Sequence, residues 1–166
     1  ENNSSKFQIL QTLKALKQKK IPSFIILPNN DAGSYEVRNQ IMKSRESDSY
    51  IFSNISRILY LGLLKNSKLI VGNSSSGLLE APSLGIPSIN IGRRQHSRVQ
   101  GSNVINCSYD VQEIEQAIRH GMSDEFREKI KNDRNPYGEG DSSEKILRIL
   151  LETKTDDKLL IKELTS

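Results

Sequence analysis

The sequence predicts an α/β domain built on an open parallel sheet of the Rossmann-like type. Short apolar segments typical of strands alternate with longer amphipathic segments typical of helices, in the order expected of β-α-β units. Several strand segments are continuously apolar, as in strands covered on both faces. The chain has 166 residues, 35% of them hydrophobic, which is enough for one domain with its own core.

The first elements are a helix, a strand and a second helix. Apolar residues recur at helical spacing over residues 4–19, where Ser4 or Ser5 can cap the start, and a proline follows. Residues 23–27 are apolar after their initial serine and predict a buried parallel strand. After a loop rich in Asn and Gly, Ser34 is expected to cap a helix that extends to about residue 43.

The middle of the chain supplies most of the expected strands. Strands are expected at residues 50–52, 68–71, 88–91 and 103–106, because Ile, Val and Tyr are concentrated there. A helix over residues 55–65 separates the first two, since leucines recur on one of its faces.

The last part of the chain is expected to be mainly helical. Asp110 and Asp124 can each start a helix, and a turn-rich segment at residues 135–140 precedes a helix over residues 142–151. We expect one domain over residues 1–152 and a tail over residues 153–166 that is helical or frayed. A doubly wound domain normally begins with a strand, whereas this chain begins in a helix, so we expect the first strand upstream of Glu1.

Composition narrows the possible partners and location. The net charge is only +4, and basic residues are not interleaved with aromatic ones, so we expect no nucleic-acid partner. No apolar run approaches the roughly 20 residues of a membrane span, so we expect no membrane partner. The single cysteine, Cys107, excludes an internal disulfide and fits a reducing cytoplasm, where we expect the protein to act.

The principal candidate site is the serine-rich stretch between an expected strand and a short helix. Ser74, Ser75, Ser76 and Gly77 come at the carboxyl edge of the sheet, where ligands of this architecture bind. Hydroxyls at a helix start suit a phosphate, and Glu80, about one helical turn later, can accept from two vicinal ribose hydroxyls. A serine-capped helix with a solvated glutamate explains the same residues equally well.

Two further loops follow expected strands. Arg93, Arg94 and Arg98 can clamp a diphosphate, although a solvated basic loop is the simpler interpretation of any one of them. Asn29 and Asp31 can contact a base or a neighbouring domain, or serve only as turn residues.

Other chemistries are less well supported. There is no Walker or GxGxxG motif, which argues against an ATPase or a hydride-transfer site. His96 has no nearby acid or cysteine in the sequence, so we expect no metal site, and we expect no cofactor. His120 is expected at a helix C-terminus, and Cys107 is expected to be a small core residue rather than a nucleophile.

Several motifs resemble the UDP-N-acetylglucosamine 2-epimerase family. They are the segments at residues 72–77, 80–87 and 90–95, with two further motifs at residues 28–34 and 135–140 in the family's order. Non-hydrolysing members usually have Asp-Ser-Gly-Gly where this chain has Asn-Ser-Ser-Ser at residues 73–76. The chain is more similar to the hydrolysing branch, which forms N-acetylmannosamine for sialic acid synthesis.

The resemblance implies the C-terminal half of a glycosyltransferase-B-like enzyme with two domains and UDP-N-acetylglucosamine in the cleft between them. Ser74 and Ser75 would contact the diphosphate, Glu80 the ribose, and Arg94 and Asn29 other parts of UDP. Weaker candidates for UDP binding are Ser76, Gly77, Arg93 and Asp31. The resemblance places the proton-transfer carboxylates in an N-terminal domain, so the 166 residues alone are expected to be inactive.

Three alternatives are compatible with the sequence. They are a non-hydrolysing epimerase, a glycosyltransferase of the same architecture, and a UDP-sugar-binding module without catalysis. Homo-oligomer formation is compatible with each of them.

Overall fold

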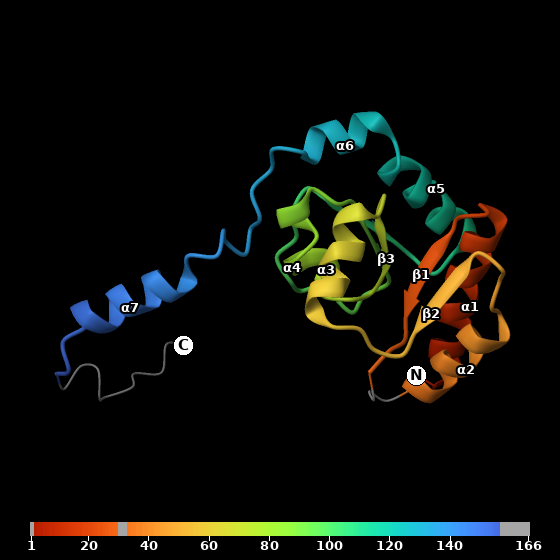
Figure 1. Ribbon diagram of the computed structural model, residues 1–166, viewed down its shortest axis with the longest axis horizontal. Helices are drawn as coiled ribbons and strands as arrows, with labels where there is room; N and C mark the ends of the chain where they lie inside the picture. The colour runs from red at the N-terminus through yellow and green to blue at the C-terminus, as the bar shows by residue number, and fades with distance from the viewer. Residues whose placement is uncertain (1, 30–32, 157–166) are drawn as a thin grey trace. The chain divides into compact units, whose positions relative to one another are not determined.

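The computed structural model of the chain describes residues 2–29 and 33–156. Contacts divide the chain into two compact units, Glu1–Pro136 and Tyr137–Ser166. Figure 1 shows the elements of both units.

The first unit alternates strands and helices along the chain. Its elements are α1 (Asn2–Gln18), β1 (Ser23–Ile26), α2 (Ser34–Lys43), β2 (Ser49–Phe52), α3 (Arg57–Asn66), β3 (Ile70–Gly72), α4 (Ser76–Leu79), the 3₁₀ helix η1 (Pro82–Leu84), β4 (Ser88–Ile91), β5 (Val104–Cys107), α5 (Val111–Gly121) and α6 (Asp124–Ile130).

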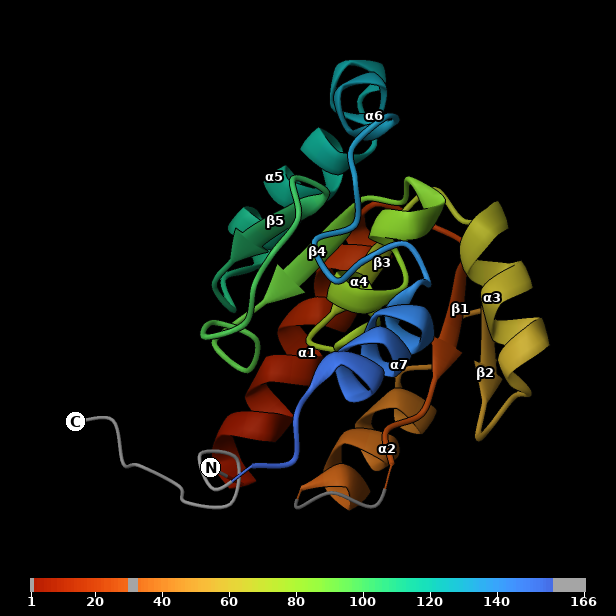
Figure 2. The same ribbon diagram turned by 90° about the vertical axis from the view of Figure 1, so that its left-hand side faces the viewer.

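All described strand pairs are parallel, which confirms the predicted α/β class with open parallel sheets. One sheet has the order β3-β4-β5, and the other consists of β1 and β2. Figure 2 shows β3, β4 and β5 side by side. Because the pairing is parallel, the carboxyl ends of β3 and β4 lie at the same edge, and the loops that follow them are neighbours.

Helices cover both faces of the three-stranded sheet. On one face, Ile89 and Ile91 of β4 pack with Ala15 of α1 and with Ile114 and Ile118 of α5. On the other face, Leu64 of α3 packs with Ala81 and Ile86, which flank η1. This double covering explains why all four residues of β4 are buried.

Polar side chains alternate with apolar ones along β4. Ser88 is 3% exposed and Asn90 is 2% exposed, although both are polar. Asn90 pairs in register with Asn106 of β5, and its Nδ2 donates to Asn106 Oδ1 at 2.7 Å. Since alternate residues of a strand face opposite sides, these polar groups lie opposite the apolar face formed with α1 and α5.

The first strand differs from its prediction. The sequence predicts a continuously buried strand at residues 23–27, but Phe24 is 53% exposed and Ile26 is 40% exposed. The reason is that β1 belongs to a two-stranded sheet, and its side chains alternate between a covered and an open face. Phe24 stacks instead on the rings of Tyr50 and Phe52 of β2.

Two predicted helix starts also differ in detail. Ser34 is the first helical residue rather than the cap, because Gly33 takes the cap position with a φ of 81°. The helix after the serines, α4, is only four residues long, so it has little of the dipole that we expected there. By contrast, Asp110 caps α5 as predicted, accepting from the N–H groups of Gln112 and Glu113.

The second unit contains α7 (Ser142–Glu152). Gly138 and Gly140, with φ values of 103° and 98°, form the turn before it. Contacts separate the units after residue 136, whereas the boundary expected from the sequence, at residue 152, stays a prediction. Residues 153–156 of the expected tail are not helical, and residues 157–166 lie outside the described residues. Among the described helices, none has both the length and the apolarity needed to cross a membrane.

Candidate nucleotide-binding site

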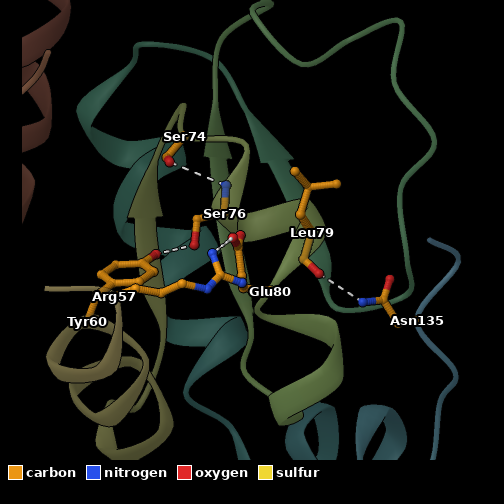
Figure 3. Close-up of polar contacts among 7 residues, drawn as sticks. All are labelled: Arg57, Tyr60, Ser74, Ser76, Leu79, Glu80 and Asn135. Atoms are coloured by element: carbon orange, nitrogen blue, oxygen red, sulfur yellow. Dashed lines mark hydrogen bonds and ion pairs between the residues drawn. The ribbon is translucent and has the colours of Figure 1, made fainter. Parts of the chain in front are cut away.

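The serine-rich stretch forms a tight turn between β3 and α4. Ser74 is exposed, Ser75 is half-buried, and Ser76 is buried at the start of the helix. The Ser74 Oγ accepts from the backbone N–H of Ser76 at 3.3 Å, as Figure 3 shows. Ser75 occupies the cap position without a side-chain capping bond, so its hydroxyl is not used to cap this helix. The capping interpretation therefore applies to Ser74 rather than to Ser75.

Ser76 is held from α3. Its hydroxyl and the Tyr60 hydroxyl share a short hydrogen bond (Figure 3). Burial raises the pKa of Tyr60 above its ordinary value, the Ser76 bond opposes this, and the negative charge of Glu80 adds to the rise. The phenol is therefore protonated at neutral pH, and its bond to Ser76 links the turn to α3.

Gly77 allows α4 to approach the sheet closely. A Cβ at this position would overlap the side chain of Ser88 on β4. Asn103, just before β5, also contacts this region: its Nδ2 donates to the carbonyls of Gly77 at 3.2 Å and Ile86 at 3.0 Å. The turn that presents Ser74 and Ser75 is therefore fixed against the sheet by packing and by buried amide bonds.

Glu80 lies at the end of α4 with its two oxygens in different environments. Oε1 is 3.6 Å from a guanidinium nitrogen of Arg57, an ion pair that Figure 3 shows. Oε2 is buried and has no hydrogen-bond partner within residues 2–29 and 33–156. A carboxylate oxygen that is buried without a partner is costly, and donors from a ligand would relieve this cost. The Glu80 side chain is 24% exposed, so it is only partly solvated.

The turn-rich motif near residue 135 contributes to the same region. Asn135 Nδ2 donates to the Leu79 carbonyl at 2.8 Å and contacts Ser83 Oγ at 2.7 Å. The first contact appears in Figure 3. Because α4 is so short, its last carbonyls need such partners, and the motif supplies one from far along the chain.

The arginine-bearing loop after β4 is joined to the serine turn. Arg93 and Arg94 are exposed, whereas Gln95 between them and Arg98 is only 3% exposed. Gln95 Nε2 donates to the carbonyl of Asn73 at 2.7 Å. The structure therefore brings the loop with Arg93 and Arg94 beside the turn with Ser74 and Ser75.

The remaining predicted residues are less closely placed. Asn29 is exposed after β1, in the other sheet, and Asp31 lies outside the described residues. His96 is exposed, and no group of three His, Cys, Asp or Glu side chains within residues 2–29 and 33–156 could hold a metal ion. His120 lies in the last turn of α5, as predicted.

Cys107 packs as a partly buried residue against the core of the first unit. Burial, with a smaller contribution from the charge of Glu113, raises its pKa to about 11. A thiol with so high a pKa is a weak nucleophile at neutral pH, which supports the predicted core role.

Sequence reasoning missed Arg57, Tyr60, Gln95 and Asn135 as parts of the site. Gln95 and Asn135 stand in the motifs quoted above, but neither had an assigned contact. Arg57 and Tyr60 lie in the first turn of α3, and only the contacts between α3 and α4 show that they belong to the site.

The fold and this turn define a Rossmann-like domain with a polar site at the carboxyl edge of its sheet. A profile of the UDP-N-acetylglucosamine 2-epimerase family matches residues 1–151. The chain belongs to this family.

Individual relatives agree with the assignment. A UDP-N-acetylglucosamine 2-epimerase of Neisseria meningitidis is 37% identical over 113 residues, which are 68% of this chain and 30% of that protein. A hydrolysing UDP-N,N'-diacetylbacillosamine 2-epimerase of Legionella pneumophila is 30% identical over 151 residues, which are 90% of this chain and 39% of that protein. The chain thus spans between about a third and two fifths of the length of these curated relatives.

The fold is also that of solved family members. The crystal structure of the UDP-GlcNAc 2-epimerase from Neisseria meningitidis bound to UDP-GlcNAc matches with a TM-score of 0.65 at 24% identity. The match covers 89% of this chain and 41% of that one. At this identity the match supports the fold alone.

Proposed function

We propose that this chain is the nucleotide-binding part of a hydrolysing UDP-N-acetylglucosamine 2-epimerase. The observation that carries the proposal is the contact between two loops at one edge of the sheet. The loop after β3 offers hydroxyls, the end of α4 offers the partly unsatisfied carboxylate of Glu80, and the loop after β4 offers arginines. Gln95 joins the two loops through Asn73. An edge that combines these groups suits a nucleoside diphosphate.

The diphosphate is proposed to bind at the hydroxyls of Ser74 and Ser75. These are the two serines of the turn that are not buried. Ser76 and Gly77 are buried and packed against Tyr60 and Ser88, so they would support the turn from behind. Because α4 has four residues, the hydroxyls and backbone donors of the turn would provide more of the binding than a helix dipole.

The ribose is proposed to bind at Glu80. Two vicinal hydroxyls could donate to the two carboxylate oxygens, including Oε2, which has no partner among the described residues. Arg57 lies at 3.6 Å from Oε1. At this distance the ion pair could persist while a ribose hydroxyl also donates to Oε1.

Arg94 is proposed to contact the nucleotide from the neighbouring loop, with Arg93 as a weaker candidate. A guanidinium is suited to a diphosphate because it can donate two parallel hydrogen bonds. Asn29 after β1 is proposed to contact a more distant part of the nucleotide, and Asp31 is a weaker candidate beside it.

The reaction implied by the family resemblance proceeds in two steps. A base removes the proton at C2 while the C1–O bond to UDP breaks, which leaves 2-acetamidoglucal. Water then adds across the C1–C2 double bond, placing hydroxyl at C1 and a proton on the opposite face of C2, to give N-acetylmannosamine. This chain would stabilise the departing diphosphate, and carboxylates elsewhere in the whole protein would transfer the protons.

The hydrolysing outcome is supported by the Asn-Ser-Ser-Ser sequence at residues 73–76 and by the named activity of the Legionella relative. The Neisseria relative has a name without that qualification, so a non-hydrolysing epimerase is the second candidate. A role in sialic acid synthesis and a cytoplasmic location are parts of the proposal that follow from the product and from the lone cysteine.

The product identifies the activity. The complete protein, incubated with UDP-N-acetylglucosamine in deuterium oxide, should release UDP together with free N-acetylmannosamine that carries deuterium at C2. Formation of UDP-N-acetylmannosamine would favour the non-hydrolysing candidate, and UDP release only with an acceptor sugar would indicate a glycosyltransferase.

Residues 1–166 alone should show no turnover. Turnover by this segment would contradict the placement of the proton-transfer groups elsewhere.

A further inference from the structure

The loop after β4 contains one residue that behaves unlike its neighbours. Arg93, Arg94, His96 and Arg98 are exposed, as expected of a basic surface loop. Gln95 is 3% exposed, although glutamine is usually found at the surface. Its side chain has a partner in the interior.

That partner is the backbone immediately before the proposed diphosphate site. Gln95 Nε2 donates to the carbonyl of Asn73 at 2.7 Å, and Asn73 directly precedes Ser74. Gln95 Oε1 is buried and has no partner within residues 2–29 and 33–156. Turning the amide over would place Oε1 against the Asn73 carbonyl oxygen, so this carbonyl fixes which end of the side chain faces it.

The loop is anchored at two further points. The Tyr109 hydroxyl forms a hydrogen bond with the backbone of Arg93. The Tyr109 ring occupies the space that a Cβ at Gly92 would need, and Gly92 has a φ of 78°. Gln100 Nε2 donates to the backbone carbonyl of Gln95 itself at 3.3 Å. The loop backbone is therefore held at Arg93 by Tyr109 and at Gln95 by Gln100 of the same loop, although its arginines are exposed.

We propose that Gln95 is a positioning residue for nucleotide binding, which joins the arginine loop to the serine turn so that both meet the same diphosphate. The inference rests on the proposed function, but it goes beyond it because Gln95 would act without contacting the ligand. Its amide sets the spacing between the backbone of Ser74 and the backbone of Arg94. Without this bond, Arg94 would have to be ordered at the moment of binding, and less of its interaction would appear as affinity.

A double-mutant cycle in the complete protein tests this role. UDP binding is measured by calorimetry for the unmodified protein, Arg94→Ala, Gln95→Met and the double variant, at low and high ionic strength. Gln95→Met keeps the length of the side chain and removes the donor. In the unmodified background, Arg94→Ala should weaken UDP binding about tenfold at low salt. In the Gln95→Met background, Arg94→Ala should weaken UDP binding less than about threefold and with less salt dependence. The reason is that Arg94 and Gln95 would act as a unit.

Gln40 provides a matched control. It is also a buried glutamine, 8% exposed, and its Nε2 donates to Glu36 within α2, away from the arginine loop. Gln40→Met should change the unfolding temperature but leave the tenfold effect of Arg94→Ala intact. If Gln95 contributed only to stability, Arg94→Ala would weaken UDP binding by the same factor in the Gln95→Met and the Gln40→Met backgrounds.

Each outcome has a defined meaning. Equal losses from Arg94→Ala with and without Gln95→Met would overturn the positioning role while leaving the proposed function in place. No UDP binding by the unmodified protein would overturn the proposed function, and this inference with it. If circular dichroism shows that Gln95→Met is unfolded, the cycle is repeated with Gln95→Glu, which keeps the shape and replaces the donor with an acceptor. Failure of both variants to fold would assign Gln95 to stability and reject the proposal.

Discussion

Asn135 and Leu79 are joined by a hydrogen bond of 2.8 Å, although they are 56 positions apart in the sequence. The bond gives a partner to a carbonyl at the end of α4, which is too short to satisfy its own last turn. The same amide group contacts Ser83 Oγ at 2.7 Å. Asn135, the first residue of the turn-rich motif at residues 135–140, thus stabilises the end of α4 beside the proposed nucleotide site.

Removing this support should destabilise the first unit. We expect Asn135→Ala to lower the free energy of unfolding by about 1–2 kcal/mol, because the Leu79 carbonyl loses a partner in a half-buried position. Asn132→Ala, at an exposed position nearby in the chain, should change it by less than about 0.5 kcal/mol. Urea unfolding of the two variants measures the difference. Equal stability of both would show that the Asn135 contact contributes nothing.

Two helical glycines should respond to alanine in opposite directions. At Gly77 in α4, a Cβ would overlap the Ser88 side chain, whereas at Gly62 in α3 a Cβ meets nothing within 4 Å. Gly62→Ala should stabilise by about 0.5–1 kcal/mol through helix propensity. Gly77→Ala should destabilise by about 1–3 kcal/mol and weaken UDP binding, because the turn moves off the sheet. Thermal unfolding of both variants provides the comparison, and stabilisation by both would contradict the close packing of α4 on β4.

Cys107 should react slowly with alkylating reagents in the folded protein. Its pKa is raised to about 11 by burial and by Glu113, from an ordinary value of 9.0. The thiolate fraction near pH 8 is therefore about 100-fold lower than in the unfolded chain. Because the folded state holds the proton more tightly, this group's stabilising contribution is present below pH 9 and is lost as the pH rises toward 11.

The measurement is the rate of iodoacetamide labelling against pH, in buffer and in urea. The chain has one cysteine, so the signal needs no assignment. A folded-state rate that levels off near pH 9, as the unfolded-state rate should, would contradict the raised pKa.

Glu80 should contribute to UDP binding through its charge. We expect Glu80→Gln in the complete protein to weaken UDP binding about tenfold or more, because a carboxamide has one acceptor oxygen and no charge. Glu115→Gln is a matched control: Glu115 also has an ion pair at 3.6 Å, with Lys19, and its side chain is 20% exposed against 24% for Glu80. Calorimetric titration of both variants with UDP would reject the ribose assignment if they bound equally well.

Local signals in the sequence predicted much of the fold. The alternation of strands and helices and the Asp110 cap depend on residues close together in the chain, and the parallel pairing follows from the long connections between successive strands; all three were confirmed. The errors arose where neighbours in space decide the outcome. Phe24 and Ile26 are apolar but lie on an uncovered face of a two-stranded sheet, and no local pattern distinguishes this face from a covered one.

For the candidate site as well, the sequence predicted some residues but not the contacts between distant ones. The sequence indicated Ser74, Ser75 and Glu80 because they follow one strand, and Arg94 because it follows the next. It could not show that Gln95 contacts Asn73, which is 22 positions away, or that Tyr60 contacts Ser76 across 16 positions. Such contacts depend on how α3 and two loops pack at the sheet edge, and sequence spacing alone does not determine this.

We propose that the turn between β3 and α4 holds the diphosphate of UDP. A crystal structure of the complete protein soaked with UDP tests this. We expect phosphate oxygens within hydrogen-bond distance of the Ser74 and Ser75 hydroxyls, with the ribose hydroxyls at Glu80. UDP bound elsewhere in well-defined density, with this turn unoccupied, would contradict it.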